Sequence, residues 1–265
     1  MAINHREVAG FMYHEVTDDP TTSGFQRPGA LPYTFGRAAF ASHLDAIAAG
    51  PLVPELVSAI DLGRGGRGRH LVLTFDDGGA SAMDAAEQLA RRGWKAHFFL
   101  ITARIGERTF LKQADIRTLR GAGHVIGTHS HTHPDIFRNL SRGLMASEWG
   151  VSRAILESLL GEPCVAASVP GGDVSRAVLE SAGEAGLQYL FTSEPLLAPE
   201  RVGETWILGR VILKSGVSAA TIRELAAFRG WQRAKLLRRL GGLARTLSPS
   251  LYAQYVRMRT REGSS

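Results

Sequence analysis

Short apolar runs alternate with amphipathic segments along most of the chain. The run 70–75 is apolar and rich in β-forming residues, which is typical of a parallel strand buried on both faces. Segment 35–49 instead spaces Phe40, Leu44 and Ile47 along one face of a helix. The two patterns predict strands at 9–16, 70–75, 96–102, 124–128, 164–169, 188–192 and 206–213, and helices at 35–49, 80–92, 111–122, 144–160, 174–185 and 219–228. This alternation predicts βαβ units and an α/β fold around a parallel sheet.

Residues that could take part in catalysis lie at the carboxyl ends of several of these predicted strands. They are His14, Asp76, Asp77, His129 and Pro170. In parallel sheets and barrels, active sites collect at the carboxyl ends of the strands. We therefore expect these residues to meet at one end of the sheet.

Two motifs supply the candidate chemistry. Asp76 and Asp77 are adjacent carboxylates within Thr-Phe-Asp-Asp-Gly, and His129 and His133 are the outer imidazoles of His-Ser-His-Thr-His. A short helical turn would place both imidazoles on one face. Carboxylate and imidazole suit zinc and similar divalent ions, and a second carboxylate would remain as a general base. Alone, the first motif is usually a turn and the second often a surface helix; together at strand ends, they favour a metal-dependent hydrolase.

Composition narrows the class further. The chain has 265 residues, 44% of them hydrophobic, which is enough for one large barrel. It contains no apolar run near the roughly 18 to 20 residues that span a bilayer, and its beginning does not resemble a signal peptide. Cys164 is the only cysteine, so no intrachain disulfide is expected. These features lead us to expect a cytoplasmic protein.

Positive charge is concentrated at the carboxyl end. Segment 229–261 holds nine Lys or Arg and no Asp or Glu, whereas the rest of the chain has 22 basic and 25 acidic residues. We therefore divide the chain into a barrel at 1–228 and a basic amphipathic tail at 229–265. The tail either contacts an anionic membrane surface from the cytoplasmic side, through 229–261, or packs on the barrel. No recognition motif accompanies the charge, so nucleic-acid binding is not expected.

On these motifs the chain resembles the polysaccharide deacetylases of the NodB-homology group, carbohydrate esterase family 4. The resemblance covers roughly 9–214. It implies a distorted (β/α)7 barrel that removes N-acetyl groups from amino sugars. It also implies that Asp76 is the general base and that Asp77, His129 and His133 bind one divalent metal. Zinc is the expected ion, with nickel, cobalt or manganese as alternatives.

Two family motifs are altered here. The third, Arg-x-Pro-x-Gly, begins with Ser168 in place of the arginine that pairs with the base, although its Pro170–Gly171 turn remains and the Gly171 N–H is expected to help hold an oxyanion. The fifth, Leu-x-His, keeps Leu208, expected in the acetyl pocket, but replaces the acid histidine with Arg210. Arginine is a poor proton donor because its pKa exceeds roughly 12.

The missing acid has a candidate in His14. Tyr13-His14 on the first strand resembles the poly-N-acetylglucosamine deacetylase branch, in which an early histidine is thought to replace the late one. The alternative is a buried structural histidine. The leading prediction is therefore a metal-dependent deacetylase of N-acetylated saccharides. A deacylase of a small or lipid-linked acylamino sugar, and a catalytically degenerate saccharide-binding barrel, are the alternatives.

Overall fold

The computed structural model describes residues 6–63, 66–172 and 174–238. Most of its strands form one curled sheet, in which β11, β1, β4, β5, β6, β7, β8 and β10 pair in parallel and β9 joins the edge antiparallel. The strands are β1 (Arg6–Tyr13), β4 (Gly68–Phe75), β5 (His97–Leu100), β6 (Val125–Thr128), β7 (Ala166–Ser168), β8 (Tyr189–Phe191), β9 (Glu200–Val202), β10 (Thr205–Leu208) and β11 (Val211–Ile212). The predicted strands thus form, with most ends shifted by one to three residues.

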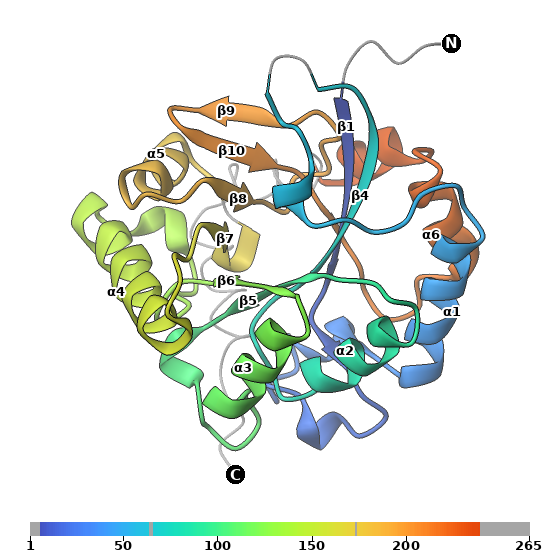
Figure 1. The fold of residues 1–265 in the computed structure, drawn as a ribbon, viewed down its shortest axis with the longest axis horizontal. Coiled ribbons are helices and arrows are strands. Elements are labelled where there is room, and N and C mark those ends of the chain that lie inside the picture. The colour runs from blue at the N-terminus through green and yellow to red at the C-terminus, as the bar shows by residue number, and fades with distance from the viewer. Residues whose placement is uncertain (1–5, 64–65, 173, 239–265) are drawn as a thin grey trace.

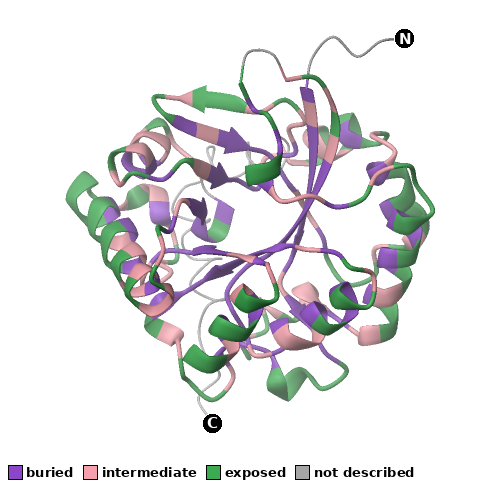
Figure 2. Ribbon diagram, viewed as in Figure 1, coloured by how far each residue is buried: buried purple, intermediate pink, exposed green. Residues whose placement is uncertain are grey.

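Helices surround the sheet on its outside (Figure 1). They are α1 (Arg37–Ala48), α2 (Ala82–Ala90), α3 (Gln113–Gly121), α4 (Arg142–Leu160), α5 (Arg176–Glu184) and α6 (Ala219–Ala226). Figure 2 shows buried positions on the strands and on the inner faces of the helices, with exposed positions outside. Helix α1 illustrates the reason, because Phe40, Leu44 and Ile47 are fully buried at the predicted spacing. The arrangement confirms the α/β distorted barrel.

The predicted strand 206–213 is wrong in one respect, because it is two strands. Its first half, β10, pairs with β8, and its second half, β11, pairs with β1 at the opposite edge of the sheet. Gly209 and Arg210 connect the halves. The chain therefore passes from β10, the strand next to the edge strand β9, to the opposite edge within two residues and draws the sheet into a barrel, with Arg210 at the seam.

A long loop covers the carboxyl ends of the first strands. Its two ends are tied together where β2 (Glu15–Val16) pairs with β3 (Thr34–Phe35). Between them, two single 3-10 turns, Pro20–Thr22 and Leu31–Tyr33, give the loop defined structure. The loop is thereby held over the end of the barrel where the candidate residues were predicted.

The beginning of the predicted tail packs on the barrel. Residues 231–238 are helical, and the Trp231 indole is buried, with Nε1 donating to the Leu225 carbonyl at 3.0 Å. The tail's remaining residues, 239–265, lie outside the described residues. Among the described helices, none is long and apolar enough to cross a membrane.

Candidate active site

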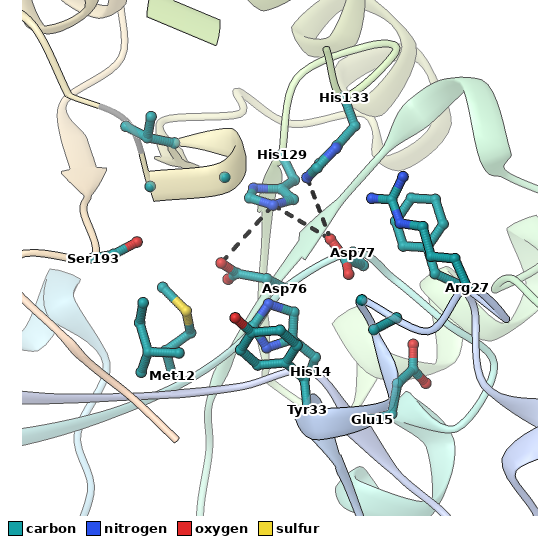
Figure 3. A pocket seen from close by; sticks show the side chains of 17 residues that line it. Met12, His14, Glu15, Arg27, Tyr33, Asp76, Asp77, His129, His133 and Ser193 are labelled. Atoms are coloured by element: carbon teal, nitrogen blue, oxygen red, sulfur yellow. Dashed lines mark ion pairs between the residues drawn. The ribbon is translucent and has the colours of Figure 1, made fainter. Parts of the chain in front are cut away.

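A pocket opens at the carboxyl ends of β1, β4, β6 and β7, as the strand-end pattern predicted. Figure 3 shows Asp76, Asp77, His129, His133 and His14 directed toward its centre. The covering loop and the seam of the barrel complete the walls. The remaining lining residues are Met12, Glu15, Phe25, Arg27, Gly29, Ala30, Tyr33, Val169, Gly171, Gly172, Ser193 and Ile212.

Backbone geometry separates the two adjacent carboxylates. The Asp76 amide still continues the sheet, donating to the Tyr13 carbonyl at 3.0 Å. Asp77 then takes φ 73° and Gly78 takes φ 80°, both left-handed conformations. Such a conformation is uncommon outside glycine and turns the chain sharply. The two side chains consequently leave the strand end in different directions, although Asp76 Oδ2 still lies 3.9 Å from His129 Nε2.

Asp77 faces the two imidazoles. Its Oδ1 lies 3.4 Å from His129 Nε2 and 3.7 Å from His133 Nε2. One ligand atom from each of the three residues falls within 4.8 Å of the others. His129 Nδ1 lies 3.0 Å from the Ser168 carbonyl, which places the ring proton on Nδ1 and leaves the Nε2 lone pair for the site. These donors fit a divalent metal with open positions for water or substrate.

The turn that joins the imidazoles differs from the prediction. Residues 129–133 form no helical turn; Ser130 (φ 65°) and His133 (φ 56°) are left-handed instead. Glu148 of α4 holds this turn, accepting from the backbone N–H groups of His131 and Thr132 at 2.8 Å each. His131 points its Nδ1 at the Thr102 hydroxyl, 2.9 Å away, and does not join the ligand set.

Asp76 is clamped by an arginine from the barrel seam. The Arg210 guanidinium donates to both carboxylate oxygens, Nη1 to Oδ1 at 2.7 Å and Nη2 to Oδ2 at 3.0 Å. The Ser168 hydroxyl donates to Oδ2 at 2.8 Å and lies 2.6 Å from Arg210 Nη2. Both charged side chains are buried, so the paired geometry is what makes their burial tolerable. The arginine absent from the third motif is thus supplied by Arg210, which lies between β10 and β11.

Small residues make room for this arginine. A Cβ on Gly10 would lie 2.5 Å from the Gly209 carbonyl oxygen and 2.8 Å from Arg210 Cγ, so only glycine fits beside the seam at Gly209 and Arg210. Ser168, which stands where the family motif has arginine, leaves space for Arg210 and bonds to it. Arg210 also donates to the Thr74 hydroxyl and the Thr192 carbonyl. Arg210 is therefore a component of the site that the sequence did not reveal.

The pKa values of Asp76 and Asp77 are lowered, whereas those of ordinary buried acids are raised. Burial alone would raise the pKa of Asp76, but Arg210 and His129 hold it below its usual value. Burial acts the same way on Asp77, and His129, His14 and His133 lower its pKa. Conversely, burial would lower the pKa of His129, but both carboxylates raise it. Both acids are thus ionised at neutral pH, and the site favours positive charge.

His14 lies between β1 and β2, beside the carboxylates (Figure 3). Its ring packs against Tyr33, with centroids 4.7 Å apart. Burial lowers its pKa, although Asp77 and Asp76 act in the opposite direction. Its buried Nδ1 has no hydrogen-bond partner among the described residues. A buried nitrogen without a partner is costly, and here it belongs to a side chain that lines the pocket.

Of the other residues predicted for the pocket, Gly171 lines it, whereas Pro170 and Leu208 do not. Gly171 lines the pocket with φ 62°, whereas Pro170 is buried beside it in the 3-10 turn Pro170–Gly172. Arg238 from the C-terminal helix holds this turn, donating to the Gly172 carbonyl at 2.6 Å and to Glu194 at 2.9 Å. Leu208 is outside the pocket lining and packs in an apolar cluster that includes Val72 and Phe99. Its position does not support a place in the acetyl pocket.

Comparisons with known proteins agree with this geometry. Residues 63–190 match the family described as polysaccharide deacetylase. YxkH of Bacillus subtilis (strain 168), assigned to the polysaccharide deacetylases, is 27% identical over 151 residues, which are 57% of this chain and 53% of YxkH. The chain thus spans about half the length of that relative.

Solved structures share the fold. The polysaccharide deacetylase BC0361 from Bacillus cereus superposes with a TM-score of 0.71 at 18% identity, covering 83% of this chain and 69% of that one. IcaB from Ammonifex degensii gives a TM-score of 0.69 at 21% identity, covering 85% of this chain and 99% of IcaB. At these identities the likeness shows the architecture of the barrel.

Proposed function

We propose that this chain, whose residues 63–190 match the polysaccharide deacetylase family, is a metal-dependent hydrolase that removes N-acetyl groups from amino sugars of a saccharide. The observation that carries the proposal is the divided carboxylate pair. Asp77 lies with His129 and His133 in a ligand set, while Asp76 is paired with Arg210. One pocket thus contains a place for a cation and an ionised base.

A divalent ion on Asp77, His129 and His133 would polarise the acetamide carbonyl and acidify a water. Zinc suits these ligands, with nickel, cobalt and manganese as alternatives. Asp76 then accepts a proton from the attacking water as its oxygen forms a bond to the carbonyl carbon. Gly171 lines the pocket, and its N–H would donate to the oxyanion.

The same proton completes the reaction. Asp76 has a lowered pKa and so holds a proton weakly, whereas His14 is neutral at rest because burial lowers its pKa. His14 can therefore take up the proton and pass it to the departing nitrogen as the C–N bond breaks. The products are acetate and a free sugar amine. Arg210 keeps Asp76 ionised between turnovers.

Acetate release from N-acetylglucosamine oligomers tests the proposal. Protein loaded with zinc should release acetate, chelator should abolish the release, and returning zinc should restore it. Oligomer binding without acetate release from the metal-loaded protein would instead favour a degenerate saccharide-binding barrel. Release that is indifferent to chelator would contradict the metal's role.

The C-terminal helix suggests a second feature. Leu236 and Leu237 are 58% and 61% exposed, and Arg233 is exposed on the same helix. We propose that this segment lies on an anionic membrane surface at the cytoplasmic side, which would bring a lipid-linked saccharide within reach. Flotation with vesicles containing phosphatidylserine should recover the protein. A Leu236→Gln, Leu237→Gln double variant that floats equally would contradict the contact.

A further inference from the structure

One cation at the pocket has no place in the chemistry above. Arg27 lines the pocket from the covering loop and is half-buried. Its guanidinium carbon lies 4.2 Å from the centroid of the Phe25 ring. Within the described ranges, no carboxylate or hydrogen-bond acceptor engages its side chain. The guanidinium is thus placed by an aromatic ring while its donors stay uncommitted.

A second cation is arranged in the same way. Lys214 Nζ lies 5.6 Å from the centroid of Tyr33, and it too has no acidic partner in the part of the chain that is described. Each aromatic ring also packs on an imidazole of the site. Phe25 lies 5.7 Å from His133, and Tyr33 lies 4.7 Å from His14. Two cations are therefore held by aromatic residues that border the reacting centre.

The acidic residues of the pocket do not need Arg27 as a counterion. Asp76 is paired with Arg210, and Asp77 faces His129 and His133. Glu15 accepts from the Gly24 N–H at 3.0 Å and the Ser81 hydroxyl at 2.5 Å, and burial raises its pKa to about 7. The charge of Arg27 is consequently available to a ligand.

We propose that Arg27, assisted by Lys214, binds an anionic substituent of the substrate and selects acidic amino sugars over neutral ones. The inference rests on the proposed deacetylation. A guanidinium presents paired N–H donors that match the two oxygens of a carboxylate or phosphate. Lys214 is exposed and contributes mainly charge. Figure 3 shows Arg27 and Asp76 at the same pocket. From there the guanidinium would orient a charged sugar while its acetamide reaches Asp76.

The test compares three N-acetylglucosamine oligomers of equal length: neutral, oxidised at C6 to the carboxylate, and phosphorylated at C6. The wild type should show a higher kcat/KM for at least one charged oligomer, and the two charged arms identify the anion. Arg27→Ala should reduce the charged-to-neutral ratio roughly tenfold, mainly through KM. Arg27→Lys should retain part of the ratio, and Lys214→Ala should lower it less. Added salt should compress the preference.

Arg117→Ala is the matched control, because Arg117 is exposed on α3 outside the pocket and should leave the ratio unchanged. Calorimetric binding of the three oligomers to zinc-loaded protein tests the anion site without turnover. Equal binding of charged and neutral oligomers, or an unchanged ratio in Arg27→Ala, would overturn the anion site. Charged-oligomer preference without acetate release would instead overturn the deacetylase proposal and leave the anion site standing.

Discussion

Asp76 and Asp77 are adjacent, buried aspartates, yet the groups that surround their carboxylates differ. Asp76 accepts hydrogen bonds from Nη1 and Nη2 of Arg210 and from the hydroxyl of Ser168, so its charge is balanced within the protein. Asp77 faces His129 and His133 at 3.4 and 3.7 Å, distances that leave room for an ion between the groups. A left-handed backbone at Asp77 creates the division.

The difference teaches that the partners of a carboxylate decide its role. A carboxylate held by a buried arginine stays ionised and fixed, which suits a base. One that shares a corner with two imidazoles suits a metal ligand. The site needs a proton donor from elsewhere, because Arg210 stands where the fifth motif, Leu-x-His, has its acid histidine. The predictions below test this division, from the largest effect to the smallest.

The largest effect should follow loss of the proposed proton donor. His14→Ala should lower kcat on N-acetylglucosamine oligomers by roughly 10²- to 10⁴-fold, the usual worth of general acid–base catalysis. Zinc content should remain at the wild-type level, because His14 is outside the ligand set. His70→Ala, at the opposite end of β4, is the control histidine. Wild-type turnover in His14→Ala would remove His14 from the mechanism.

Arg210→Gln should change the base itself. Without the guanidinium the pKa of Asp76 rises, so the carboxylate is lost to protonation at higher pH. The acid limb of the kcat/KM profile should therefore move up by about one pH unit or more. Arg210→Lys should move it less. A limb that stays in place in both variants would show that Asp76 is not the titrating base; thermal melts establish that each variant is folded.

His97 is a buried, neutral histidine outside the pocket, and its titration can be compared with that of the charged residues of the site. His97 accepts from the Val57 N–H and points Nδ1 at the Leu73 carbonyl, and burial lowers its pKa to about 4. Between pH 6.5 and 4 the unfolded chain binds more protons, so stability should fall as pH falls across this window, by up to about 3 kcal/mol. Urea unfolding of His97→Gln should show a shallower dependence. An identical slope would contradict the assignment.

The smallest effect should come from Arg238. Arg238→Ala removes its bonds to the Gly172 carbonyl and Glu194, which loosens the turn that carries Gly171. We expect kcat to fall roughly three- to tenfold, as for the loss of one charge-assisted hydrogen bond. Arg233→Ala, exposed on the same helix, is the control. A fall in the control as well would point to the helix in general.

The sequence predicted the scaffold well for a physical reason. Periodicity reports which face of an element is buried, and the carboxyl ends of parallel strands must share an edge, so Asp76, His129 and His14 could be placed together in advance. It could not show that Arg210 meets Asp76. Those residues are 134 positions apart, and their contact depends on where the barrel closes between β10 and β11.

Two further details also depend on local backbone conformation and packing that the sequence does not encode. The turn 129–133 reaches its geometry through left-handed Ser130 and His133, which the spacing of histidines does not encode. Leu208 follows the family motif in sequence but faces the apolar core. The missing side chain of Gly10 and the short side chain of Ser168 were the available signals for a buried arginine. Neither signal can be interpreted without knowing that the barrel closes between β10 and β11.

Zinc binding by Asp76→Asn and Asp77→Asn tests the central claim most directly. Isothermal titration of the two variants, which remove one charge each from adjacent positions, should separate binding from catalysis. We predict that Asp76→Asn retains zinc affinity within about tenfold and loses acetate release, whereas Asp77→Asn loses zinc affinity by more than about a hundredfold. Equal loss of zinc in both variants, or greater loss in Asp76→Asn, would contradict the division between base and ligand.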